Sequence, residues 1–145
     1  IFSSCVDEQL CNFNLKNYIK SKKNKIGIIF NTDPHYKSGS HWIALFIDIT
    51  KKFIYFFDSN GQGPPKQIKI LIERINSQAK ELNMHFKISN NKGFTHQYND
   101  GQCGMYSIYF IIELLKKNKN YNYFNKTRIK DIQMKNLRKK YYNSY

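Results

Sequence analysis

The chain has 145 residues, a formal net charge of +14 and a hydrophobic share of 41%. This length favours a single domain, and the apolar residues are numerous enough to form a core. No apolar run approaches the roughly 18 residues of a membrane-spanning helix, and no signal peptide is visible, so we expect no membrane partner. The charge favours acidic partners. The heavy use of Lys, Asn and Ile also fits an AT-rich genome, which weakens an argument for nucleic acid from charge alone.

The first half of the chain predicts a sheet. Residues 1–20 show weak helical patterning, and the segment "IGIIF" at 26–30 indicates a buried strand followed by a turn-rich loop. Two further strands are predicted at 41–49 and 52–59. The short "TKK" connection between them predicts an antiparallel hairpin.

The second half of the chain predicts helices and one more strand. A helix over 66–82 has apolar residues at helical spacing, and a short strand follows at 84–89. After a polar loop, a helix from Cys103 to about Lys117 is apolar on nearly every side, which indicates a helix inside the fold. We expect a final surface helix at about 127–142.

The three cysteines set limits on metal binding and compartment. Cys5, Cys11 and Cys103 cannot all pair within the chain because their number is odd, and a reducing compartment fits such thiols. Their spacing shows no CxxC or His-rich pattern, so we expect no zinc site. The chain begins at Ile1 rather than at an initiator Met, and we therefore expect that an N-terminal segment is missing.

The predicted hairpin brings a histidine and an acid together. If the turn centres near residues 50 and 51, facing residues have numbers that sum to about 101, so that His41 faces Asn60. Asp58 then lies one diagonal step away on the same face, where a contact with His41 is plausible. Asp48 has the wrong parity for this face and belongs to the hairpin end. Asn60 stays open as an alternative partner for His41.

Cys103 stands where a polar loop meets the apolar helix, and it has two interpretations. A cysteine in this position is commonly a packed core thiol. At the first turn of a helix, however, free N–H groups and the helix dipole favour a thiolate, and His41 could take its proton while Asp58 orients the ring. Gly104 leaves room beside the sulfur for a substrate backbone. Gln97 can direct its NH2 to the same place, where it would form an oxyanion hole with the Cys103 N–H.

The order of these residues carries a resemblance to a known family. The segments "HWIALFID", "YFFDSNG" and "QYNDGQCGMY" resemble the cysteine proteases that are specific for ubiquitin-like proteins, the family that cleaves SUMO. They are most similar to the viral relatives, the polyprotein-processing proteases of large nucleocytoplasmic DNA viruses. The resemblance covers roughly residues 26–116. It implies an α+β, papain-like fold with a central mixed or antiparallel sheet, a buried helix headed by the nucleophilic cysteine, and flanking helices.

The resemblance implies a role for each matched residue. His41 would be the base, Asp58 its orienter, Cys103 the nucleophile and Gln97 the oxyanion donor. Trp42 matches a tryptophan that walls a narrow channel for Gly-Gly in that family, whereas a second wall tryptophan has no counterpart here. The expected substrate-binding residues are Trp42, Gly104 and Asn60.

Neighbouring polar residues and thiols have ordinary explanations. His96 adjoins Gln97, but it lies in a loop, and we interpret it as incidental and not as the base. Asp100 fits a helix-capping role as well as a substrate role. We interpret Cys5 and Cys11 as spectator thiols.

The resulting hypothesis is a single cysteine endopeptidase domain over 1–145, with a basic C-terminal helix or tail at 117–145. It would cleave a protein substrate after Gly-Gly-like motifs in viral polyprotein or core protein precursors, in a virion or the host cytoplasm. Its chemistry needs no metal and no cofactor. The alternatives are a SUMO- or ubiquitin-deconjugating effector acting on host proteins, an effector acetyltransferase, and a basic nucleic-acid-binding module without catalysis. Nonspecific nucleic-acid binding is also predicted as a secondary property of the basic surface.

Overall fold

The computed structural model describes residues 10, 12–32 and 41–142. The interpretation of Cys5 and Cys11 as spectator thiols lies outside these residues. The elements in chain order are α2 (Leu15–Lys20), β1 (Lys25–Asn31), β2 (Trp42–Asp48), β3 (Phe53–Phe57), α3 (Lys66–Glu81), β4 (Lys87–Asn90), α4 (Cys103–Leu115), the 3-10 helix η1 (Tyr121–Asn125) and α5 (Asp131–Tyr142).

The four strands form one mixed sheet in the order β1-β2-β3-β4. The pairs β1–β2 and β2–β3 are antiparallel, whereas β4 runs parallel to β3. Ala44 faces Phe57 and Asp48 faces Phe53, so facing residues of the hairpin have numbers that sum to 101, as predicted. Asp48 Oδ1 accepts the main-chain N–H of Lys51 at 2.8 Å, which confirms its place at the hairpin end.

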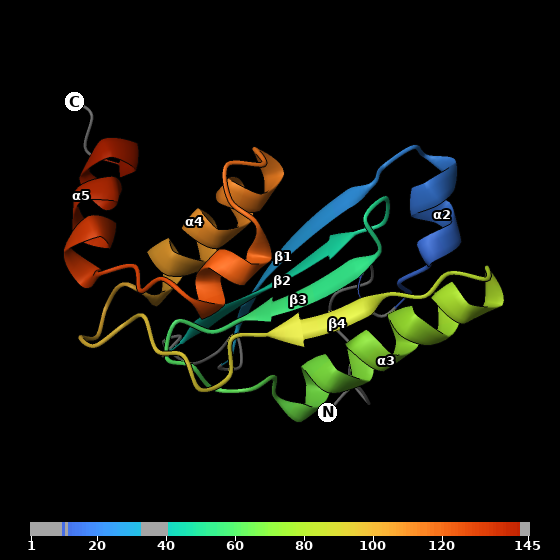
Figure 1. Ribbon diagram of the computed structural model, residues 1–145, viewed down its shortest axis with the longest axis horizontal. Helices are drawn as coiled ribbons and strands as arrows, with labels where there is room; N and C mark the ends of the chain where they lie inside the picture. The colour runs from blue at the N-terminus through green and yellow to red at the C-terminus, as the bar shows by residue number, and fades with distance from the viewer. Residues whose placement is uncertain (1–9, 11, 33–40, 143–145) are drawn as a thin grey trace.

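The sheet is covered on both faces, because alternate residues of β2 and β3 point to opposite sides. α3 packs on one face and α4 on the other, with α5 beside α4 (Figure 1). On the α3 side the buried strand residues are Ile43, Leu45, Ile47, Ile54 and Phe56. On the α4 side they are Ala44, Phe46, Phe53, Tyr55 and Phe57. This double coverage explains the almost continuous apolar runs of these two strands.

The predicted strand at 84–89 is displaced in the structure. The main-chain N–H of Met84 donates to the Ala79 carbonyl at 2.8 Å, so Met84 belongs to the end of α3. Pairing with β3 begins only at Lys87, which faces Phe53, and β4 therefore runs over Lys87–Asn90.

The C-terminal part of the described chain is more deeply packed than a tail. Phe124, Ile129 and Met134 are at most 2% exposed and belong to the core on the α4 side. α5 begins at Asp131 instead of about 127, because the residues before it make hydrogen bonds with the His96 segment. The predicted surface helix is thus confirmed over Asp131–Tyr142, with most of its side chains exposed, but it starts about four residues later than expected.

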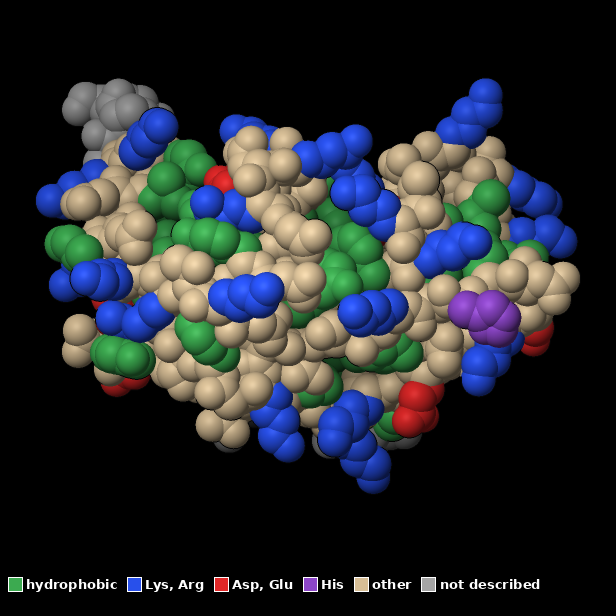
Figure 2. Space-filling view, viewed as in Figure 1, with side chains coloured by type: hydrophobic (Ala, Val, Ile, Leu, Met, Phe, Trp, Pro, Cys, Tyr) green, Lys and Arg blue, Asp and Glu red, His purple; other side chains and the backbone are tan. Residues whose placement is uncertain are grey.

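Basic side chains are spread over the face of the molecule seen in Figure 2, where acidic ones are few. The sequence carries 24 Lys and Arg against 10 Asp and Glu, in agreement with this view. In the part of the chain that the structure describes, no helix is long and apolar enough to span a bilayer.

Candidate active site

A histidine and a carboxylate meet at the sheet end where β2 begins and β3 ends. His41 Nε2 lies 2.7 Å from Asp58 Oδ1. This is the contact that the hairpin register predicted. Asn60 is exposed, and it gives its main-chain N–H to Asp58 Oδ1 at 2.8 Å. The structure therefore makes Asp58 the hydrogen-bond partner of His41, and Asn60 supports Asp58.

A buried asparagine fixes the main chain of Asp58. Asn91 Oδ1 accepts the N–H of Asp58 at 2.9 Å, and Asn91 Nδ2 donates to the Asp58 carbonyl at 2.7 Å. Phe56 and Asn90 form the last β3–β4 pair. At the next position the Asn91 side chain takes the place of a strand main chain and continues the hydrogen bonding to β3. Asn91 was missed in the sequence, because an asparagine before Gly93 looks like an ordinary turn residue.

Cys103 is the first residue of α4, and its environment favours the thiolate. Burial alone raises the pKa of the thiol. Hydrogen bonds from His41 and the main-chain N–H groups of Trp42 and Gly104, with the charge of His41, outweigh burial and lower the pKa. Hydrogen bonds to Asp58 and Cys103 in turn raise the pKa of His41 to about 9, against the effect of burial. Both shifts act in the direction of a Cys103 thiolate beside a His41 imidazolium.

This ion pair predicts a distinctive pH dependence. Cys103 should react with iodoacetamide at lower pH than an ordinary thiol, whose pKa is about 8.5. Peptide hydrolysis should then fall as His41 loses its proton on raising the pH through about 9, because the leaving amine needs that proton. Alkylation rates measured from acid to alkaline pH test the ionisation of Cys103, and kcat/KM over the same range tests the loss of activity at alkaline pH (the alkaline limb). An alkylation profile like that of a free cysteine would contradict the ion pair.

Gln97 is buried, and two hydrogen bonds fix the orientation of its amide. Its Nε2 donates to the Asn99 carbonyl at 2.8 Å, and Ser59 Oγ donates to its Oε1 at 2.7 Å. Because a carbonyl only accepts, the Asn99 contact identifies which end of the amide is the NH2. That NH2 carries two hydrogens, so it can donate a second hydrogen bond besides the one to Asn99. Nothing in the sequence points to Ser59 beyond its place after Asp58.

His96 is a fully buried structural residue and not an incidental loop residue. Its Nε2 donates to the Phe124 carbonyl at 2.8 Å, and its Nδ1 accepts the N–H of Ile129 at 3.0 Å. Both ring nitrogens are thus engaged, and burial lowers the pKa of the ring. This confirms that His96 is unavailable as the base, although it corrects the reason.

The segment that carries Gln97 is anchored to the C-terminal part of the chain. Asp131 Oδ2 accepts the main-chain N–H groups of Tyr98 and Asn99 at 3.0 and 3.2 Å. Arg128 donates its Nε–H to the His96 carbonyl at 2.9 Å, and its guanidinium lies 3.4 Å from the centre of the Tyr98 ring. Asp131 is the only acidic residue after α4, and this isolation in a basic segment was the available signal.

Trp42 and Gly104 are brought together beside the sulfur. A Cβ placed on Gly104 would lie 3.7 Å from Trp42 Cδ1, so the indole covers the glycine, and Trp42 remains 39% exposed. The contacts of Asn60 run to Asp58 and, through its carbonyl, to Thr95 at 3.1 Å. Asp100 is exposed and does not cap α4, whose N-cap residue is Gln102.

These groups define a class of enzyme. A helix-terminal thiol of lowered pKa, next to a histidine held by a buried carboxylate, is the arrangement of the papain-like cysteine proteases. Within residues 10, 12–32 and 41–142, no three His, Cys, Asp or Glu side chains gather where they could hold a metal ion.

Comparison with known proteins identifies the family. The model of the Ulp1 protease family, C-terminal catalytic domain, matches residues 11–145, so the chain belongs to this family. A protein of Acanthamoeba polyphaga mimivirus described as a thiol protease is 36% identical over 106 residues, 73% of this chain and 35% of the relative. A SUMO-1 cysteine protease of African swine fever virus is 32% identical over 122 residues, 83% of this chain and 44% of the relative.

Solved structures confirm the α+β fold. A crystal structure of the African swine fever virus protease superposes with a TM-score of 0.71 at 32% identity, covering 79% of this chain and 43% of that chain. ChlaDub1 from Chlamydia trachomatis shares the fold, with a TM-score of 0.58 at 16% identity over 86% of this chain and 61% of that chain. The chain spans less than half the length of the curated viral relatives it matches.

Proposed function

We propose that this chain carries the catalytic groups of a cysteine endopeptidase. Cys103 is the nucleophile, His41 is the general base and acid, and Asp58 orients His41. The observation that carries the proposal is the 2.7 Å contact between His41 and Asp58 beside a helix-terminal thiol whose pKa is lowered. Because His41 Nε2 faces Asp58, Nδ1 is the ring nitrogen that serves the thiol.

The proposed reaction proceeds in two acyl transfers. The Cys103 thiolate adds to the scissile carbonyl carbon, and the carbonyl oxygen becomes an oxyanion. As the oxyanion collapses, the C–N bond breaks and His41 gives its proton to the departing amine, which leaves a thioester on Cys103. A water molecule then attacks the thioester while His41 takes its proton. The carboxylic product leaves, and the thiolate–imidazolium pair forms again.

Gln97 is proposed to stabilise the oxyanion with the second hydrogen of its NH2, together with the main-chain N–H of Cys103. Gln97→Ala is expected to lower kcat by about 10²–10³-fold, the usual effect of losing one oxyanion donor. Iodoacetamide alkylation of Cys103 forms no oxyanion, so its rate and pH profile should stay unchanged. An equal loss of alkylation would show that Gln97 acts on the thiol or on the fold.

Ser59 offers a second test of the same role, because its hydroxyl positions the Gln97 amide. Ser59→Ala should also lower kcat, by up to about 10²-fold, and should have little further effect when Gln97 is already alanine. Ser107→Ala is the matched control: this serine is 1% exposed, and its hydroxyl bonds to the Cys103 carbonyl one turn back in α4. Near-normal activity is expected for the control.

The substrate is proposed to be a protein cleaved after a Gly-Gly-like sequence, most simply a viral polyprotein or core protein precursor within a virion or the host cytoplasm. Support comes from the viral relatives and from Trp42 lying over Gly104, beside the sulfur. The second candidate is removal of SUMO, which is favoured by the SUMO-1 protease description of the African swine fever virus relative.

A substrate panel separates these candidates. Fluorogenic SUMO, fluorogenic ubiquitin and peptides with an internal Gly-Gly are incubated with the protein under reducing conditions. Faster cleavage of the peptides supports precursor processing, and faster cleavage of SUMO supports deconjugation. If Gly-to-Ala peptides are cleaved as fast as Gly-Gly peptides, the proposed motif is wrong.

A further inference from the structure

A cavity of about 340 Å³ opens at the sheet end opposite to the candidate active site. β1, β3 and β4 begin there, β2 ends there, and the last turn of α4 closes one side. Cys103 stands at the other end of α4, whose 13 residues span about 20 Å. The cavity is therefore separate from the groups that carry the proposed proteolysis.

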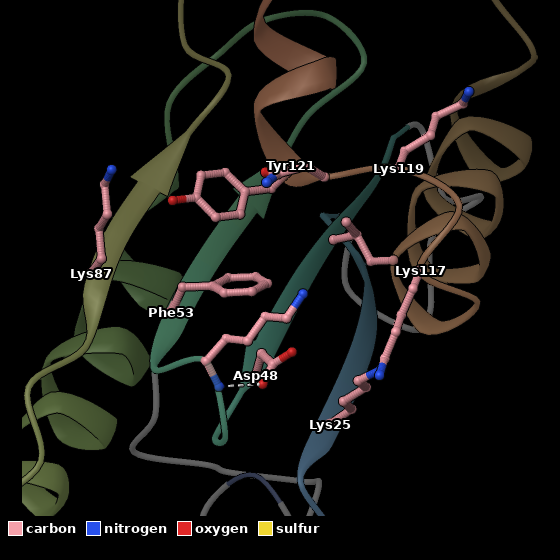
Figure 3. Close-up of a pocket in the computed structure, with 10 residues that line it drawn as sticks. Lys25, Asp48, Phe53, Lys87, Lys117, Lys119 and Tyr121 are labelled. Carbon is pink, nitrogen blue, oxygen red and sulfur yellow. Dashed lines mark hydrogen bonds between the residues drawn. The ribbon is translucent and has the colours of Figure 1, made fainter.

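Lysines from separate segments surround this cavity. Lys25 comes from β1, Lys51 from the hairpin turn and Lys87 from β4, while Lys117 and Lys119 follow α4. Figure 3 shows four of these side chains, all except Lys51, labelled around the cavity. Lysines gathered around one opening repel one another, and a bound anion would relieve that repulsion.

The cavity holds little negative charge to balance these lysines. Among the described residues that line it, the one carboxylate, Asp48, is 3% exposed and accepts the main-chain N–H of Lys51. Five lysines against one carboxylate leave these residues with a net charge of +4. The ion pairs of the described residues involve none of the five. Lys119 Nζ instead lies 4.1 Å from the centre of the Tyr123 ring.

The helix end accounts for only part of this cluster. Cations are expected after the C-terminus of any helix, which suffices to explain Lys117 and Lys119. It does not explain Lys25, Lys51 and Lys87, which three different parts of the sheet bring to the same opening. These three carry the argument.

The surface between the lysines is apolar and aromatic. The ring centres of Phe53 and Tyr121 lie 4.7 Å apart, and Figure 3 shows both rings between the basic side chains. Phe53 and Leu114 are buried, at 9% and 6% exposure, so half-buried Tyr121 supplies the aromatic surface that a ligand can contact. A ligand that fits both features carries several negative charges and a flat, partly apolar group.

We propose that this cavity binds a small organic polyphosphate of the nucleoside triphosphate type. The phosphates lie among Lys25, Lys51 and Lys87, and the base packs against Tyr121. The volume of the cavity falls at the lower end of the roughly 300–1,000 Å³ of small-molecule sites, which favours such a compact ligand.

Calorimetric titration with ATP at low ionic strength tests the proposal, since surface charges are then least screened. The triple variant Lys25→Gln, Lys51→Gln, Lys87→Gln should bind ATP at least about tenfold more weakly, given up to about 1 kcal/mol for each exposed charge pair. The matched control replaces Lys66, Lys69 and Lys80 of α3, which are exposed and lie outside the cavity, by glutamine. The control changes net charge equally and should bind ATP normally.

Two further probes decide the class of ligand. Inorganic tripolyphosphate should bind more weakly than ATP, because it has no base to pack on the Tyr121 ring. Equal binding by tripolyphosphate, or equal weakening of ATP binding by the α3 control, would overturn the proposal. A third outcome would also overturn it: the protein binds a single-stranded oligonucleotide but not ATP, and the triple variant loses this binding. The lysines would then belong to a nucleic-acid surface.

Discussion

Replacing Cys103 by serine is expected to lower kcat/KM for hydrolysis of a Gly-Gly peptide by at least about 10⁴-fold. The variant keeps the size of the side chain, so the helix and its packing are retained. His41 and the N–H groups of Trp42 and Gly104 favour a thiolate, whereas a serine hydroxyl stays protonated in the same surroundings. Initial rates with a fluorogenic peptide give the effect directly.

The remaining thiols supply an internal control for this variant. Cys103→Ser should lose the alkylation by iodoacetamide that occurs below the pH at which an ordinary thiol reacts. A variant in which Cys5 and Cys11 are replaced by serine should keep both this alkylation and peptide hydrolysis. Full activity of Cys103→Ser would remove Cys103 from the mechanism and with it the proposed function.

The contact between His41 and Asp58 could be predicted because it depends on local rules. A short connection fixes the register of a hairpin, and the alternation of side chains along a strand then decides which residues share a face. The register observed, with Ala44 facing Phe57, is the one that the "TKK" connection implies. The buried helix behind Cys103 was equally visible, because its apolar residues cover almost every side.

The supports of the site could not be predicted in the same way. Asn91 reaches Asp58 across 33 positions, Ser59 reaches Gln97 across 38, and Asp131 reaches Tyr98 across 33. Such bonds depend on how distant loops pack, and no periodic pattern records them. Where a side chain bonds to a main-chain group, the partner can be any type of residue, so the sequence does not reveal the pair.

The packing of the C-terminal segment could not be predicted, because the composition of the segment hides it. Phe124, Ile129 and Met134 stand singly among Lys, Asn and Tyr, so no apolar face is apparent. They are buried because the segment folds back over α4 and the His96 loop, where Tyr106 Oη lies 2.7 Å from the Ile129 carbonyl. This packing gives a segment that looks like a charged tail a direct part in holding Gln97.

Asp58→Ala is expected to lower kcat/KM by about 10³–10⁴-fold, the range found when the acid of a catalytic triad is removed. The hydrogen bond to Asp58 is the largest contribution that raises the pKa of His41 to about 9. Without it His41 loses its proton at lower pH, so the alkaline limb of kcat/KM should move to lower pH. A limb that stays near pH 9 would contradict this assignment.

Two further variants separate charge from orientation and Asp58 from Asn60. Asp58→Asn should lower kcat/KM less than Asp58→Ala does, because an amide oxygen can still accept hydrogen bonds from His41 Nε2 and from the N–H of Asn60. It should still move the alkaline limb to lower pH, because the negative charge is lost. Asn60→Ala should change kcat/KM by no more than about threefold, because Asn60 supports Asp58 through its main chain, which alanine retains. If Asn60→Ala were as damaging as Asp58→Ala, the side chain of Asn60 would have to orient His41 during turnover, despite the 2.7 Å contact between His41 and Asp58.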